Sequence, residues 1–207
     1  MFYLDKLDKE YRFGDIIRGF ALAEATIESP PNNRKFCVDI TSPEFCVILT
    51  PCCSIGDKVI ALTPLDHVKN SFFSNPYFAG DLTNINRRML PEEAFPPAGW
   101  EKLNPEDRRK RVEEGSTHAC LEYFIFADHE LLPKYIVDRR DGKIETNHYM
   151  IDFRKIYRVN CSKIINAKNA PSELKVLQLT IGTRSELRDK MAFYFSRPAE
   201  EDMSFNV

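Results

Sequence analysis

The chain has 207 residues, of which 43% are apolar and 12% aromatic, which is enough to bury the core of one soluble domain. Its 29 Lys and Arg residues nearly balance 31 Asp and Glu residues, and the net charge of -2 excludes a global attraction to nucleic acid or to a membrane surface. No run approaches the roughly 18 apolar residues of a membrane span, and the N-terminal stretch is charged throughout, so we expect a cytoplasmic protein with no membrane partner.

The first third of the chain predicts a series of short β strands. The β-branched, aromatic or continuous apolar runs occupy residues 13–27, 35–41, 45–50 and 58–65. Turn-forming residues separate these runs at 29–33, 42–43 and 54–57. Closely spaced short strands joined by such turns predict an SH3-like small barrel or a bent antiparallel sheet.

The segment 66–117 differs in character, because several prolines interrupt it and it contains the only tryptophan. It is predicted to be an inserted, partly helical segment. Within it, Asn104 is a candidate N-cap, Pro105 stands at the first helical position and Gly115 is a stop signal. These signals predict a short exposed helix.

After the insertion the strand pattern returns and then gives way to a helix. Further strands are predicted at 120–127, 134–138, 143–153 and 155–160. For the helix at 183–197, Thr183 and Glu186 form a candidate capping box. One face of this helix is predicted to carry Leu187, Met191, Tyr194 and Phe195. We therefore predict a single domain over 1–207, mainly β with peripheral α, with a C-terminal helix on its flank.

Four segments carry a resemblance to known proteins. They read RFGDIIRGF, CVILTPCCSIGDKVIALTPL, YMIDFRKIYRV and VLQLTIGTRSELRDKMAFYFSR. Their order resembles a family of uncharacterised bacterial and phage proteins that share a Thr-x-x-Cys turn, and this implies a phage-linked setting such as defence or toxin control. In that family an Asp commonly follows the turn cysteine, whereas this chain has Ser54 there.

The front half is also similar, more distantly, to the MazF/PemK-type toxin barrels, which are metal-independent endoribonucleases with an SH3-like fold. Gly14-Asp15 matches their first strand. At the place of their basic catalytic residue this chain has Glu44-Phe45, which leaves Arg34 as the substitute. The resemblance implies a catalytic set of Arg34 and Thr50 with Cys52 or Cys53.

Six cysteines without a secretory signal indicate reduced thiols. Cys52 and Cys53 have three interpretations. One is a nucleophile activated by a nearby imidazole. The second is a zinc site with His118 and Cys120, which would supply the nitrogen and sulfur ligands that zinc prefers. The third, which we favour, is a pair of small residues that fill a crowded corner between two strands.

A basic and aromatic cluster is the best candidate for a binding face. It consists of Arg154, Lys155, Tyr157 and Arg158. Strand alternation from residue 153 to 158 would place Lys155 and Tyr157 on one side and the two arginines on the other. Such a face suits RNA, although basic residues also protect sheet edges from aggregation.

The chain contains no phosphate-binding loop, dinucleotide glycine pattern, zinc-protease helix or nucleophile elbow. We therefore expect no nucleotide cofactor. The favoured function is a non-catalytic interaction module that binds a protein or RNA partner. The alternatives are a metal-independent endoribonuclease of the MazF/PemK kind and a zinc-stabilised accessory protein.

Overall fold

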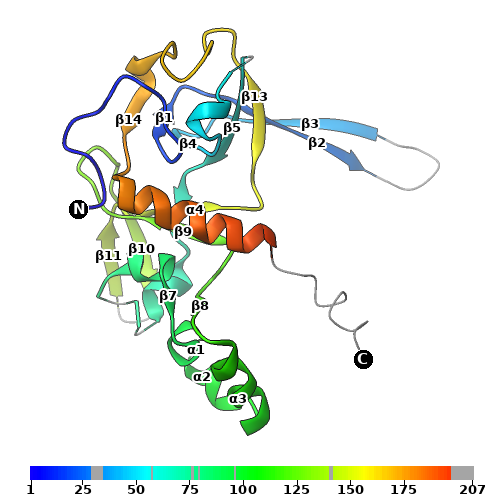
Figure 1. The fold of residues 1–207 in the computed structure, drawn as a ribbon, viewed down its shortest axis with the longest axis vertical. Coiled ribbons are helices and arrows are strands. Elements are labelled where there is room, and N and C mark those ends of the chain that lie inside the picture. Colours follow the sequence, from blue (N-terminus) through cyan, green and yellow to red (C-terminus); the bar gives the residue numbers. More distant parts are fainter. Residues whose placement is uncertain are drawn as a thin grey trace. The chain divides into compact units, whose positions relative to one another are not determined.

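The computed structural model confirms a mainly β fold with a C-terminal helix (Figure 1). In the described part of the chain, fourteen strands form antiparallel sheets, and no closed barrel is found. None of the helices described has the length and apolar character to cross a membrane. The description covers residues 1–28, 35–56, 58–75, 77–78, 80–95, 97–139 and 142–196.

The chain folds as two compact units. The first unit joins Met1–Asp66 to Arg154–Arg184, and the second joins His67–Phe153 to Ser185–Val207. Residues 67–153 of the second unit are therefore inserted into the sequence of the first, and they contain most of the predicted insertion at 66–117.

The first unit is built on a five-stranded sheet in the order β13-β5-β4-β1-β14. The strands are β1 (Ile16–Arg18), β4 (Phe45–Ile48), β5 (Val59–Pro64), β13 (Tyr157–Asn160) and β14 (Lys175–Leu177). Ile16 lies opposite Val47 on β4 and opposite Leu177 on β14. All four residues of β4 are buried, so both faces of this central strand are covered. The core of this unit includes Tyr11, Ile48 and Leu62.

A separate two-stranded ribbon leaves the same unit and extends away from its sheet (Figure 1). Its strands are β2 (Leu22–Glu28) and β3 (Lys35–Thr41), which pair in a regular antiparallel register over seven residue pairs. The sequence pattern at 13–27 predicts one continuous run, but Gly19, with φ of 83°, adopts a backbone conformation that favours glycine and separates β1 from β2.

The described residues of the second unit form one three-stranded and two two-stranded sheets. The larger sheet has the order β6-β12-β9, with β6 (Asp66–His67) where the chain enters the unit, β12 (Tyr149–Asp152) and β9 (Tyr123–Phe126). The smaller sheets are β10 (Tyr135–Arg139) with β11 (Gly142–Thr146), and β7 (Arg88–Met89) with β8 (Thr117–His118). Phe78, Ile85 and Ile125 are among the residues of its core.

Three short helices occupy the chain between β7 and β8. They are α1 (Pro91–Ala94), α2 (Pro97–Lys102) and α3 (Pro105–Glu114). The predicted signals for α3 are confirmed, because the Asn104 side chain accepts a hydrogen bond from the backbone N–H of Asp107 and Gly115 stands at the C-cap with φ of 83°.

The C-terminal helix α4 (Ile181–Ser196) begins two residues before the predicted start. Thr180 rather than Thr183 caps it, since Thr180 Oγ1 lies 3.4 Å from the backbone N–H of Thr183. The predicted capping box is therefore wrong, and Glu186 instead forms an ion pair with Arg87 at 3.7 Å.

The buried face of α4 also differs from the apolar face that its sequence predicts. Leu187 is fully buried, but Phe195 is 60% exposed. The buried face instead contains Thr183 and Lys190 together with Leu187. These three residues are spaced by four and three positions, so they lie on one face of the helix.

Candidate functional site

The Thr-x-x-Cys turn follows β4 and is tied to β5. Thr50 Oγ1 accepts a hydrogen bond from the backbone N–H of Ala61 at 2.6 Å, so its hydroxyl already has a role in holding the turn. Arg34 lies outside the described residues. The endoribonuclease set therefore stays a prediction, with Thr50, Cys52 and Cys53 near one another in the turn and the basic member unplaced.

The interpretation of Cys52 and Cys53 as residues that fill a crowded corner is wrong. Both are exposed, in a one-turn 3₁₀ helix over Cys52–Ser54, and Cys53 Sγ lies 3.8 Å from Ser54 Oγ. The turn directs Ile55 into the core instead, where it is 4% exposed. The guanidinium of Arg12 is near this turn: burial alone would lower its pKa, but Asp8, Glu10 and Cys52 together raise it.

These placements predict the order in which the thiols react. Native protein treated with iodoacetamide should be alkylated first at Cys52 and Cys53, because they are exposed. Cys46 should stay unmodified, since it is 1% exposed and burial raises the pKa of its thiol to about 12. Peptide mapping measures this order, with urea-unfolded protein as the control in which every thiol reacts. Equal rates at Cys46 and Cys52 in the native protein would contradict the placement.

The predicted basic face is partly neutralised by carboxylates of its own unit. Lys155 Nζ lies 3.0 Å from Asp66 Oδ2, and the Tyr157 hydroxyl donates a hydrogen bond to Glu24 Oε2 at 3.3 Å. Arg154 and Arg158 are exposed, the first in a turn and the second on β13. Because β13 begins only at Tyr157, the strand alternation predicted from residue 153 does not form.

The predicted zinc ligands are divided between the units. Cys52 and Cys53 belong to the first unit, whereas His118 and Cys120 belong to the second. Among the residues described, no group of three or more His, Cys, Asp and Glu side chains is placed to hold a metal ion. Burial, with Lys190 and Arg88, lowers the pKa of His118 to about 4, so its imidazole is neutral at pH 7. The zinc site stays a prediction.

A buried ion pair in the first unit joins Asp15, the residue before β1, to Lys175 on β14. Asp15 is fully buried, and its Oδ2 lies 2.8 Å from Lys175 Nζ. The same oxygen accepts a hydrogen bond from the backbone N–H of Arg12 at 2.8 Å, while Oδ1 has no partner among the described residues. Lys175 also donates to the backbone carbonyls of Asp8 and Glu10, so the pair anchors the N-terminal segment to the sheet.

Burial dominates the electrostatics of this pair. Desolvation raises the pKa of Asp15 to about 6, although Lys175 and the Arg12 amide favour the carboxylate. At pH 7 the carboxylate is therefore ionised. The sequence motif Gly14-Asp15 marked the position, but no signal marked Lys175, because the three-residue β14 is too short to show a period.

A second buried amine lies in the second unit. Lys190 on α4 is fully buried, and its Nζ donates to the backbone carbonyls of Ile85 at 2.6 Å and Ala119 at 3.1 Å. Burial lowers its pKa to about 7, with a partial offset from Cys120 and Glu122. Neither this lysine nor Asp15 is accessible to a substrate, so both serve the fold.

The β2–β3 ribbon is largely exposed, because residues 23–25 and 38–41 are all exposed. Register places Ala23 opposite Ile40 and Ala25 opposite Val38, and these four residues form what we call the apolar face of the ribbon. Val38 is 64% exposed and Ile40 is 70% exposed. On the other face, Glu24 lies directly opposite Asp39.

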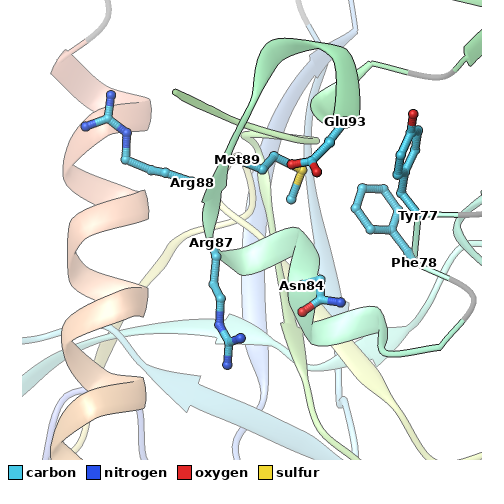
Figure 2. Close-up of a pocket in the computed structure, with 7 residues that line it drawn as sticks. All are labelled: Tyr77, Phe78, Asn84, Arg87, Arg88, Met89 and Glu93. Carbon is cyan, nitrogen blue, oxygen red and sulfur yellow. The ribbon is translucent and has the colours of Figure 1, made fainter. Parts of the chain in front are cut away.

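A pocket of about 230 Å³ lies in the second unit, and we call it the β7 pocket. Figure 2 shows Tyr77 and Phe78 on one side and Met89 and Glu93 on the other, with Asn84 below them. Arg87 and Arg88 also line the pocket, but the side chain of Arg88 is directed toward α4 (Figure 2). Sequence reasoning did not find this site, because its aromatic and acidic members fall in a segment that has no period.

Comparison of the chain with protein-family models, with curated proteins and with solved structures found no match.

Proposed function

We propose that the chain is a non-catalytic interaction module that binds a partner protein by adding one strand of the partner to the β2–β3 ribbon. The observation that carries the proposal is the exposure of Val38 and Ile40 on a regular ribbon of two strands. An isolated pair of strands is marginally stable in water, and exposed neighbouring apolar side chains are typical of a binding surface.

The edges of the ribbon suit this mode of binding. β2 and β3 form a sheet of two strands in the described structure, so each has an outer edge without a partner strand. Bulges and prolines are two devices that proteins use to block strand addition at a sheet edge. The register of the ribbon has no bulge, and β3 contains no proline. A partner strand on the edge of β3 would gain backbone hydrogen bonds and cover Val38 and Ile40.

The opposite face of the ribbon indicates the chemistry of the partner. Glu24 and Asp39 lie directly across from each other, and like charges in this position destabilise a strand pair. A basic side chain of the partner would relieve this repulsion. The expected partner segment is therefore an extended strand that alternates apolar residues with Lys or Arg.

The ribbon β10–β11 of the second unit provides the contrast. Its cross-strand neighbours carry opposite charges, with Lys143 Nζ 3.5 Å from Asp138 Oδ1 and Lys134 Nζ 2.9 Å from Glu145 Oε2. Such pairs stabilise the ribbon, which also packs Val137 into the core of the second unit. The β2–β3 ribbon lacks them at its Glu24–Asp39 pair, which supports its assignment as the binding element.

A displayed library of short random peptides tests the proposal. Peptides that wild-type protein enriches should alternate apolar and basic residues, and they should bind V38K/I40K protein at least tenfold more weakly, because the lysines place charge on the apolar face and repel the basic side chains. The matched control is Ile136→Lys, which changes an apolar residue that is 65% exposed on β10. This control should capture the peptides as wild type does.

Two results would overturn the proposal. One is an enriched pool without the alternation of apolar and basic residues. The other is equal capture by the wild-type and V38K/I40K proteins. Since Val38 and Ile40 are exposed, the double variant is expected to fold, and circular dichroism checks this expectation.

A further inference from the structure

We propose that the β7 pocket binds a guanine nucleotide, with the base against Tyr77, the Watson–Crick edge of the base on Glu93 and the phosphate on Arg87. The proposal concerns the second unit only and is independent of the ribbon.

The size and walls of the pocket suit one flat ring system. Its volume of about 230 Å³ is below the range of roughly 300 to 1,000 Å³ that is typical of sites for drug-sized ligands. Tyr77 is 45% exposed and offers a ring face to solvent, whereas Phe78 behind it is buried. Met89 stands on the other side (Figure 2), and an aromatic ring facing a thioether forms a slot in which a base can stack.

Glu93 provides the polar end of this slot. Its Oε2 accepts a hydrogen bond from the backbone N–H of Leu90 at 3.3 Å at the start of α1, which fixes the side chain. A carboxylate accepts about four hydrogen bonds, so most of its capacity is left for a ligand. Guanine presents two adjacent N–H donors, N1–H and N2–H, which match a carboxylate in a two-bond arrangement. Adenine presents one donor next to an acceptor, and that acceptor would face a carboxylate oxygen.

The charges at the pocket favour an anionic ligand. Two arginines and one glutamate line it. Arg88 is already engaged, since its Nη2 donates to the carbonyl of Ser116 at 2.6 Å. Arg87 is 61% exposed in its side chain, and its pair with Glu186 at 3.7 Å is a weak surface interaction that a phosphate can replace. Figure 2 shows the Arg87 side chain directed away from Tyr77 and Glu93, so the guanidinium would turn from Glu186 to meet a phosphate at the rim of the pocket.

Calorimetric titration of the full chain with GMP, guanosine and AMP tests the proposal. We expect GMP to bind about tenfold more tightly than guanosine, because of Arg87, and at least tenfold more tightly than AMP, because of Glu93. A uridine-rich RNA with a single guanine distinguishes the two sources of the ligand. Binding that is tighter than for GMP assigns the pocket to RNA, and weaker binding assigns it to the free nucleotide.

Four variants separate the three contacts. Tyr77→Ala should weaken GMP binding by about tenfold to a hundredfold. Glu93→Gln retains an acceptor for Leu90 and should bring GMP and AMP to within about threefold of each other. Arg87→Ala should weaken GMP binding but leave guanosine binding unchanged. The control is Arg109→Ala on α3, whose side chain is 74% exposed and does not line the pocket.

The proposal is overturned if GMP shows no binding at millimolar concentration, if AMP binds as tightly as GMP, or if Tyr77→Ala and Arg109→Ala bind GMP equally.

Discussion

Replacing Lys175 by methionine is expected to lower the free energy of unfolding of the first unit by about 3 to 5 kcal/mol. The substitution keeps most of the side-chain volume but leaves the buried carboxylate of Asp15 without its cation, 2.8 Å away in the wild type. It also removes the donor to the carbonyls of Asp8 and Glu10. Native-state hydrogen exchange of the β1 and β4 amides in dilute denaturant measures the loss for this unit alone.

Two controls identify the ion pair as the cause. Lys168→Met changes a lysine of the same unit whose side chain is 78% exposed, and should cost little. Asp15→Asn combined with Lys175→Met removes the buried charge and should recover part of the stability that Lys175→Met alone removes. If the double variant were as unstable as the sum of the two single variants, the pair would not be coupled.

The pKa of Asp15 determines how the stability of the Lys175→Met variant depends on pH. Its folded pKa of about 6 is above the unfolded value of 3.8, so the folded state binds more protons between these values and gains stability as the pH falls from 6 toward 4. Without Lys175 this pKa must rise further, because the nearest cation is lost. The loss in free energy of unfolding, relative to wild type, should therefore be smaller at pH 5.5 than at pH 7.5. An equal loss at both pH values would contradict the role of the Asp15–Lys175 pair.

Replacing Lys190 by methionine has the second largest expected effect, a loss of about 2 to 4 kcal/mol in the second unit at pH 7. The variant leaves the buried carbonyls of Ile85 and Ala119 without the lysine donor, and each unsatisfied group costs about 1 to 3 kcal/mol. The variant also removes the desolvation cost of the buried Lys190 amine, and this gain offsets part of the loss. Hydrogen exchange of the β9 and β12 amides reports the loss.

A pH titration of stability distinguishes this role from simple packing. The folded pKa of Lys190 is about 7 and the unfolded value is 10.5, so between these values the unfolded state binds more protons. The unfolding free energy of the wild type should therefore rise with pH across this range. The Lys190→Met variant should lack the part of the rise that comes from Lys190. Lys110→Met, at an exposed position on α3, should retain it. Parallel pH profiles for Lys190→Met and wild type would rule out the buried amine as the cause.

The elements that the sequence predicts well are those whose signals are local. Helix α3 has its cap, its first-turn proline and its stop within twelve residues, and β3 coincides with the predicted run at 35–41. The mainly β class followed from the same short-range patterns.

The features that the sequence misses depend on partners far along the chain. The period of α4 indicates an apolar face but cannot show that Lys190 finds two carbonyls at residues 85 and 119. The run at 35–41 predicts a strand but does not show that Val38, Asp39 and Ile40 are all exposed. At the Cys52-Cys53 turn, the direction of a single 3₁₀ turn decides which residue enters the core, and composition does not encode that direction.

The insertion of residues 67–153 between the two segments of the first unit has a consequence for folding during synthesis. Residues 67–153 of the second unit are contiguous, so most of it is complete on the nascent chain before β13 and β14 leave the ribosome. Strand β1 must wait for its neighbour β14, and Asp15 must wait for Lys175, until residues 175–177 have been made. The first unit therefore begins before the second but closes only after residues 67–153 have been made, and the slow closure of this long loop is expected to limit its folding rate.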